Sequence, residues 1–203
     1  MDKKQQGDIF GNNKKTKNMN LTQQMAKQFR DVYFGGNWTA VNLKENLADV
    51  TWQQAITKVY SFNTIAVLVY HINYFVDAII KVLQGGPLDA HDKYSFDHPP
   101  IDCPEDWKKL LTKIWADAER CASLIEQLPE DKLGETFSEE KYGNYYRNIH
   151  GVIEHTHYHL GQIVLIKKIL YSRRLINREK IFKKKKFIVC DVSSAASSLA
   201  VLH

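Results

Sequence analysis

The sequence predicts an all-α protein, a four-helix bundle with a long loop between its second and third helices. Apolar residues recur at helical spacing in four segments, at residues 21–33, 64–83, 104–128 and 142–171. Glycine or proline follows each of the first three segments. The 203 residues, 44% of them apolar, suffice for one sizeable core, and nothing indicates a second folded domain.

The first helix is expected at Leu21 to Tyr33. Gly35-Gly36 ends it, because glycine readily adopts the left-handed conformation that closes a helix. Residues 37–50 are rich in turn-forming and β-branched types, so we expect an irregular segment across the end of the bundle. Thr51 then caps a short helix that extends to Tyr60, with a glutamine three residues on that completes a capping box.

The second long helix is expected at Thr64 to Leu83, with Asn63 as its N-cap and Gly85-Gly86-Pro87 as its end. The longest uncharged stretch of the central helices, Val59 to Asp77, lies largely within it. Because this stretch contains a histidine and two asparagines, it indicates a helix buried in the core rather than a membrane span.

The connection from Leu88 to Cys103 is long for a helix bundle, and loops of this length are often functional. If it folds over a pocket between the helices, Tyr94, Phe96 and His98 line a substrate channel. A surface crossover without a role is the alternative.

The third helix opens at Pro104-Glu105-Asp106, which places two acids at the positive end of the helix dipole. It ends at Leu128-Pro129, and a short acidic connector follows at residues 130–141. Tyr142-Gly143-Asn144 starts the fourth helix. The buried stripe of the third helix is expected to contain Trp107, Leu111, Ile114, Ala118, Cys121 and Ile125.

Four of the eight histidines lie in the fourth helix. His155 and His159 are four residues apart and share a side with the apolar residues, so both rings point towards the core. His150 and His157 fall on the other side of the helix, towards solvent or a partner. A spacing of four brings two ring nitrogens close enough to bind one metal ion at the ~2.0–2.1 Å that zinc requires.

A third ligand is expected from His71, which lies mid-helix on the apolar face of the second long helix. Taken singly, each histidine is compatible with a core residue satisfied by a hydrogen bond. Burying three ionisable rings together is costly unless each finds a partner, and one shared cation serves all three. Three imidazoles with a fourth position open to water or substrate is the ligand count of a catalytic zinc-type site.

The string His155-Thr-His-Tyr-His159-Leu-Gly-Gln-Ile, together with Val-Tyr-His71-Ile upstream, resembles the DinB-like (damage-inducible, YfiT-like) superfamily of four-helix metalloproteins. The resemblance covers residues 21–171. It implies that His71, His155 and His159 bind a divalent metal ion such as zinc or nickel, and it implies a homodimer. Gly161, opposite the histidine face, leaves room for a helix of a second subunit.

Some members of that superfamily are thiol-dependent transferases or isomerases that use bacillithiol, mycothiol or glutathione. The resemblance therefore implies a thiol S-transferase, with a small-molecule thiol at the open metal position and an electrophilic substrate as its partners. Two alternatives remain: a non-enzymatic metal-binding dimer of a stress response, and a metal-dependent hydrolase. No Ser/His/Asp set, phosphate-binding glycine loop or carboxylate pair supports another reaction.

We expect three regions: a polar, basic N-terminal tail at residues 1–19, the bundle at residues 20–172, and a basic, disordered extension at residues 173–203. The net charge of +5 comes from the ends, because residues 20–171 contain 15 basic and 19 acidic residues. We therefore expect no specific nucleic-acid binding. The opening residues lack the apolar core of a secretory signal and the last stretch is too polar for a span, so we expect a cytoplasmic protein that does not bind membranes.

The three cysteines have no CxxC spacing, which indicates reduced thiols. Cys121 lies on the apolar stripe of its helix and is expected in the core. Cys103 lies in the long loop, where a reactive role is the less favoured interpretation. Cys190 falls in the C-terminal extension.

Overall fold

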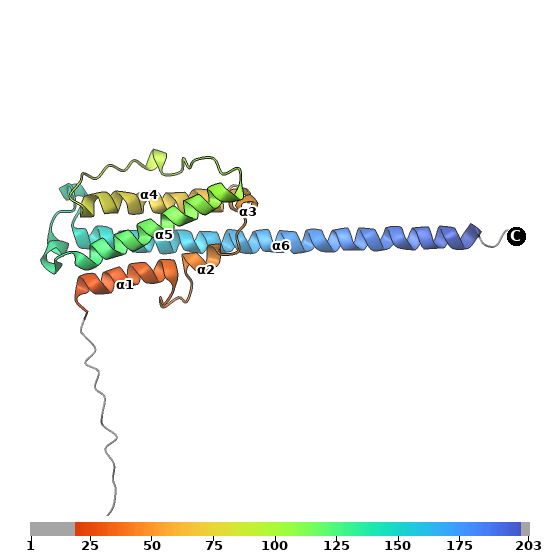
Figure 1. The fold of residues 1–203 in the computed structure, drawn as a ribbon, viewed down its shortest axis with the longest axis horizontal. Helices are drawn as coiled ribbons and strands as arrows, with labels where there is room; N and C mark the ends of the chain where they lie inside the picture. Colours follow the sequence, from red (N-terminus) through yellow and green to blue (C-terminus); the bar gives the residue numbers. More distant parts are fainter. Residues whose placement is uncertain (1–18, 200–203) are drawn as a thin grey trace, which may run out of the picture.

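Four long helices pack side by side in the computed structural model, which describes the backbone of residues 19–199 and the side chains of residues 19–175 (Figure 1). Helix α1 contacts α5 and α6, and α4 contacts the same two helices. No strand occurs within residues 19–199, so the all-α class is confirmed. The long helices are α1 (Leu21–Phe34), α4 (Ile65–Leu83), α5 (Pro104–Gln127) and α6 (Tyr145–Leu199).

Short helices occupy the connections. The segment expected to be irregular contains α2 (Leu43–Leu47), which Asn42 caps through its side chain. Thr51 caps α3 (Trp52–Ile56) with the predicted capping box, but α3 ends before Tyr60. The remaining connections contain the 3-10 turns η1 (Asp92–Tyr94), η2 (Glu130–Gly134) and η3 (Glu140–Tyr142).

The start of helix α4 and its N-cap each lie one residue later than predicted. The side-chain oxygen of Thr64, rather than that of Asn63, accepts a hydrogen bond from the backbone N–H of Val67. Both residue types are good caps, so the sequence did not discriminate between the two neighbours. By length and composition α4 could span a membrane, but 67% of its most apolar window is buried inside the bundle. This burial agrees with the expected core helix.

The core is continuous across the four helices. α1 contributes Phe29, Val32 and Tyr33, each with 0% exposure, and α5 packs Ile114 and Ile125 against them. On the other side of the bundle, α4 and α6 contribute mostly isoleucine and valine. Burying side chains of this size stabilises the fold by about 1.5–3 kcal/mol each.

Helix α6 extends beyond the bundle, and Figure 1 shows its backbone continuing to Leu199. This differs from the disordered extension expected at residues 173–203. No glycine or proline follows Gly161, so the sequence after it contains no helix-breaking residue. The predicted tail at residues 1–19 lies almost wholly outside the described residues.

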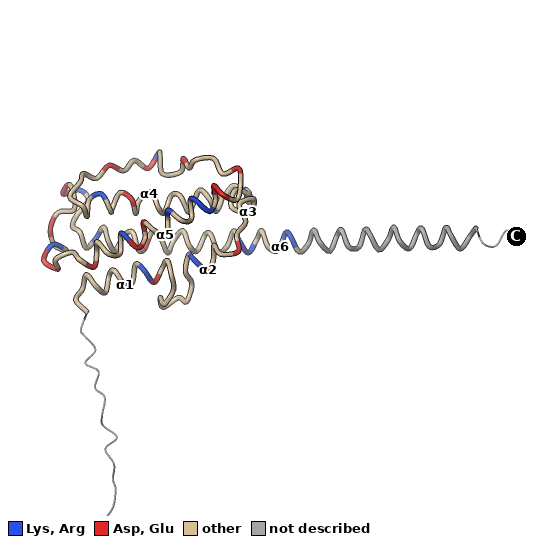
Figure 2. The backbone as a smooth tube through the Cα atoms, in the orientation of Figure 1, with Lys and Arg blue, Asp and Glu red and all other residues tan. Residues whose placement is uncertain are grey.

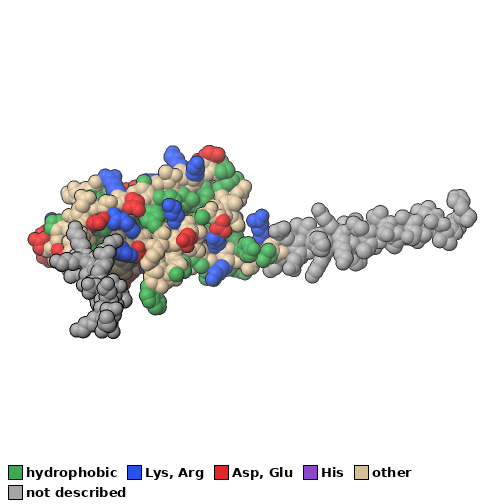
Figure 3. All heavy atoms as spheres, turned by 60° about the horizontal axis from the view of Figure 1, so that its bottom comes forward, with side chains coloured by type: hydrophobic (Ala, Val, Ile, Leu, Met, Phe, Trp, Pro, Cys, Tyr) green, Lys and Arg blue, Asp and Glu red, His purple; other side chains and the backbone are tan. Residues whose placement is uncertain are grey.

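Charged residues of both signs are interspersed along the described helices (Figure 2). The face shown in Figure 3 likewise mixes acidic and basic side chains without a large patch of one sign. That face therefore shows no basic stripe of the kind that nucleic-acid-binding domains present, and the expectation of no specific nucleic-acid binding stays a prediction.

Candidate metal centre

Three histidines from two helices converge inside the bundle. His71 lies in the middle of α4, and His155 and His159 lie one turn apart on α6. Nε2 of His155 lies 3.0 Å from Nε2 of His71 and 3.0 Å from Nε2 of His159. Nitrogens that share one ion at ~2.0–2.1 Å have similar spacing, so the cluster is positioned to bind a metal ion.

Hydrogen bonds hold the far nitrogens of two of these rings. Ser95 Oγ donates to the backbone oxygen of Asp92 at 2.7 Å, so it accepts the Nδ1 proton of His71 at 2.8 Å. Gln162 Oε1 accepts the Nδ1 proton of His159, also at 2.8 Å. Because Nδ1 carries the proton in both rings, each ring presents the lone pair of Nε2 to the common point, as a metal ligand must.

The ring of His155 cannot donate a proton to both of the other rings. Neutral His155 has one proton and lies between two acceptor nitrogens, so at least one close pair of nitrogens has no proton between them. Nδ1 of His155 is also buried and has no hydrogen-bond partner among the residues that the structure describes. An unsatisfied buried polar atom costs roughly 1–3 kcal/mol. A cation among the three Nε2 atoms removes the repulsion between lone pairs, so these residues fit a divalent metal ion.

Burial keeps the three imidazoles neutral. Desolvation, followed by the charges of His159 and His71, lowers the pKa of His155 to about 4. Desolvation is also the main cause that lowers the pKa of His71 and the pKa of His159. Near neutral pH the rings are therefore in the unprotonated state that binds metal ions.

Two residues of the loop between α4 and α5 contact the cluster, whereas the sequence left open whether this loop covers a pocket or only crosses the surface. The ring of Phe96 stacks on the ring of His71 with centroids 4.1 Å apart, and the neighbouring Ser95 is fully buried. Of the other residues expected to line a channel, Tyr94 and His98 contact other parts of the loop and of α4.

The remaining histidines of the fourth helix lie outside the cluster, as their helical positions predict. Nδ1 of His150 lies 3.4 Å from a carboxylate oxygen of Glu154, one turn along the helix. His157 is half-buried rather than solvent-facing, and this burial lowers its pKa.

Neither of the two cysteines whose side chains are described is an activated thiol. Cys121 is fully buried in the core, as predicted, and burial raises its pKa to about 12. Cys103 donates a hydrogen bond to a carboxylate oxygen of Asp106 at 3.1 Å, and this bond raises the pKa of the thiol. Reactive cysteines need a lowered pKa, so neither residue fits that role. The side chain of Cys190 lies outside the described residues.

A cavity of about 390 Å³ lies beside the cluster, and His155 forms part of its wall. The cavity is bounded by α4, α6, the start of the long loop and the connector that precedes α6. Its walls are mostly apolar, with polar groups from Arg147 and Asn148. The apolar residues include Phe75, Ile79, Leu88, Phe137 and Val152.

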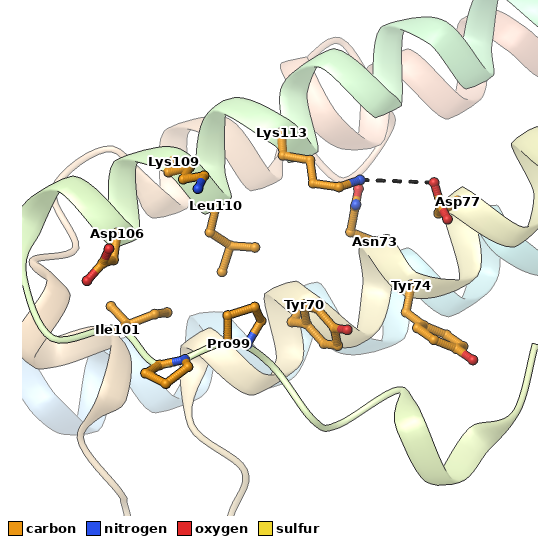
Figure 4. Close-up of a pocket in the computed structure, with 11 residues that line it drawn as sticks. Tyr70, Asn73, Tyr74, Asp77, Pro99, Ile101, Asp106, Lys109, Leu110 and Lys113 are labelled. Carbon is orange, nitrogen blue, oxygen red and sulfur yellow. Dashed lines mark ion pairs between the residues drawn. The ribbon is translucent and has the colours of Figure 1, made fainter.

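A second cavity, of about 340 Å³, lies between α4, α5 and the end of the long loop (Figure 4). None of the three histidines lines it. Lys113 pairs with Asp77 at 4.0 Å, drawn as the dashed line in Figure 4, and also with Asp117. Because none of the three imidazoles lines this cavity and its Lys113 is already paired, we place the candidate chemistry at the first cavity.

A sequence model of the DinB superfamily matches residues 35–163, which include all three histidines. The chain belongs to the DinB superfamily. Membership and the three-histidine cluster together fit a DinB metal-binding protein. Neither the curated proteins nor the solved structures contain a match to this chain.

Several residues around this DinB site were missed by sequence reasoning. Gln162 lies three residues after His159, a spacing that puts two helical side chains in contact, so the sequence contained a usable signal. Ser95 comes from a loop 24 residues after His71, and no local pattern connects the two. Arg147 was also overlooked, because its role depends on a cavity that only the fold reveals.

Proposed function

We propose that this protein is a metal-dependent thiol S-transferase that binds a divalent cation through His71, His155 and His159. The observation that carries the proposal is the convergence of three Nε2 atoms beside a mostly apolar cavity. A purely structural site has its coordination positions filled by protein, whereas His155 borders a space of about 390 Å³.

The chain's own residues prepare this site. Ser95 and Gln162 fix two of the rings through their Nδ1 protons. Phe96 covers one face of His71, and Phe75 lies with its ring centroid 5.1 Å from the centroids of both His71 and His155. These aromatic rings cover part of the cluster with apolar surface and so lower the local dielectric constant, which strengthens electrostatic interactions within it.

A bound divalent cation supplies one chemical effect, a lowered pKa for a thiol that coordinates it. In the proposed reaction a low-molecular-weight thiol loses its proton to solvent and its sulfur forms a bond to an electrophilic carbon. The bond from that carbon to the leaving group breaks, and the leaving group departs with the electron pair. The apolar cavity beside His155 holds the electrophile during this step.

The first test is the metal content of the purified protein. We expect about one divalent ion per chain in the wild type and a small fraction of that in His155→Ala. His157→Ala is the matched control, since it removes a histidine from the same helix outside the cluster and should retain the ion. Equal metal content in all three proteins would remove the site from consideration.

The second test is turnover by the metal-loaded protein. Glutathione and bacillithiol should react with 1-chloro-2,4-dinitrobenzene or monochlorobimane faster with the wild type than with His155→Ala. Hydrolysis of 4-nitrophenyl acetate without added thiol would instead identify a hydrolase. If chelation lowers the melting temperature and no reaction occurs with any thiol, the ion only stabilises the bundle.

A further inference from the structure

The cavity beside the cluster follows one stripe of α6. Arg147, Gly151 and His155 are four residues apart in turn, a spacing that places side chains one above another on a helix, and all three line the cavity. About 12 Å of helix axis separates the first from the last at 1.5 Å per residue. The stripe therefore has the guanidinium of Arg147 at one end and the candidate metal ligand His155 at the other.

Gly151 keeps the middle of this stripe open. It has ordinary helical backbone, and a Cβ added there would meet no atom within 4 Å. Neither a left-handed conformation nor close packing therefore requires glycine, although glycine in a helix interior is less stable than alanine. The space that a side chain would occupy belongs to the cavity.

Arg147 provides the charge at the far end. Its Nη1 donates to the backbone oxygen of Tyr142 at 2.9 Å, which holds the side chain over Gly143. Among the described residues, no carboxylate lies within ion-pair distance of this guanidinium. A planar guanidinium with free N–H groups matches the geometry of a carboxylate better than that of any neutral group.

We propose that the cavity selects an electrophilic substrate with an apolar body and a carboxylate, which binds with the carboxylate at Arg147 and the apolar body over Gly151. The reactive carbon then lies near His155. This inference rests on the proposed function, because it takes the histidine cluster as the reactive centre. It makes Arg147 and Gly151 the residues that determine substrate specificity.

The test uses two probes of equal length, 5-phenylpentanoate and 5-phenylpentan-1-ol, titrated calorimetrically into zinc-loaded protein. The wild type should bind the carboxylate roughly ten- to a hundredfold more tightly than the alcohol, as expected for a hydrogen-bonded charge. Arg147→Gln should abolish this preference without weakening the binding of the alcohol. Arg120→Gln, which removes an exposed arginine of α5, is the matched control and should retain the preference.

A second pair of variants tests whether the open space over Gly151 holds the substrate. Gly151→Leu should weaken both probes at least tenfold, whereas Gly151→Ala should weaken them less because it adds one methyl group. Gly161→Leu is the control, since Gly161 also has open space around it, lies on the same helix and does not line this cavity. Unchanged binding of both probes in Gly151→Leu would overturn the proposed path of the substrate.

The same titration, repeated without zinc, shows whether the carboxylate binds to Arg147 or to the metal ion. We expect the carboxylate preference to survive chelation of the zinc. A preference that disappears on chelation and persists in Arg147→Gln would overturn the inference. Carboxylate preference without thiol turnover would contradict only the proposed reaction, and turnover without the preference would contradict only the specificity.

Discussion

The two sides of the bundle are built for different purposes. Between α1 and α5, apolar side chains such as Phe29 and Ile125 are fully buried, and Arg30 closes the rim with ion pairs. Between α4 and α6, the interface contains three imidazoles, a buried nitrogen without a partner and an adjoining cavity. The first side is mostly apolar, although among the described residues the hydroxyl of Tyr33 is also buried there without a hydrogen-bond partner. The second side brings three ionisable rings together beside a cavity.

This difference indicates how stability and function are divided. Buried polar groups without partners destabilise a fold, so they persist where they are needed for binding or chemistry. We therefore expect substitutions between α1 and α5 to change the free energy of unfolding and those between α4 and α6 to change ligand and metal affinity.

The largest effect is expected from Phe29→Ala. The side chain has 0% exposure, and truncating a buried phenylalanine costs about 3–5 kcal/mol of unfolding free energy. Urea denaturation measures this loss, and the folded variant should bind zinc with unchanged affinity. Phe75→Ala is the counterpart beside the histidines: half-buried, it should lose less stability but weaken zinc binding. The opposite ranking for the two variants would refute the division of roles.

An intermediate effect is expected from Ser95→Ala. It leaves the Nδ1 proton of His71 without its acceptor, and loss of such an orienting partner typically costs 10–100-fold in metal affinity. Competition with a chromophoric chelator measures the affinity. Ser123→Ala, beside Arg30 between α1 and α5, serves as control and should bind zinc as the wild type does. If the two variants bind zinc equally, Ser95 does not orient the ring.

The smallest effect is expected from Arg30→Gln. Its guanidinium pairs with Glu119 at 3.1 Å and with Glu126 at 2.8 Å at the surface of the bundle. Such pairs contribute only about 0.2–1 kcal/mol each and are screened by salt. Denaturation at low and high ionic strength should therefore show a small loss that salt reduces. A loss above about 2 kcal/mol would mean that the rim contributes as much as the core.

Much of this architecture could be predicted from the sequence. The apolar periodicity located the long helices, since period and capping residues are local properties of the chain. The histidine cluster was found because helical spacing fixed which faces His155 and His159 share with their apolar neighbours. Helical spacing alone could not bring α4 to α6, so His71 was expected as the third ligand from its place on the apolar face of its helix and from the family resemblance. The folded chain places its Nε2 3.0 Å from that of His155.

The parts that could not be predicted depend on loops and on empty space. The contact of Ser95 with His71 requires the path of a loop that has no repeating pattern. The cavity over Gly151 is defined by residues from four separate segments, so no single stretch reveals it. The C-terminal helix was missed for a different reason, because a helix can continue without an apolar face when nothing in its sequence breaks it.

The segment Leu88 to Cys103 takes part in two tasks at once. Its Ser95 fixes the ring of His71, and its Leu88 and Ala90 line the cavity where substrate is proposed to bind. Any molecule whose binding shifts this segment therefore changes the affinity of the histidines for the ion. By thermodynamic reciprocity, the bound ion changes the affinity of the protein for that molecule by the same factor. Under the proposed function, binding of the cation therefore changes the affinity for substrate, although the two ligands bind to different atoms.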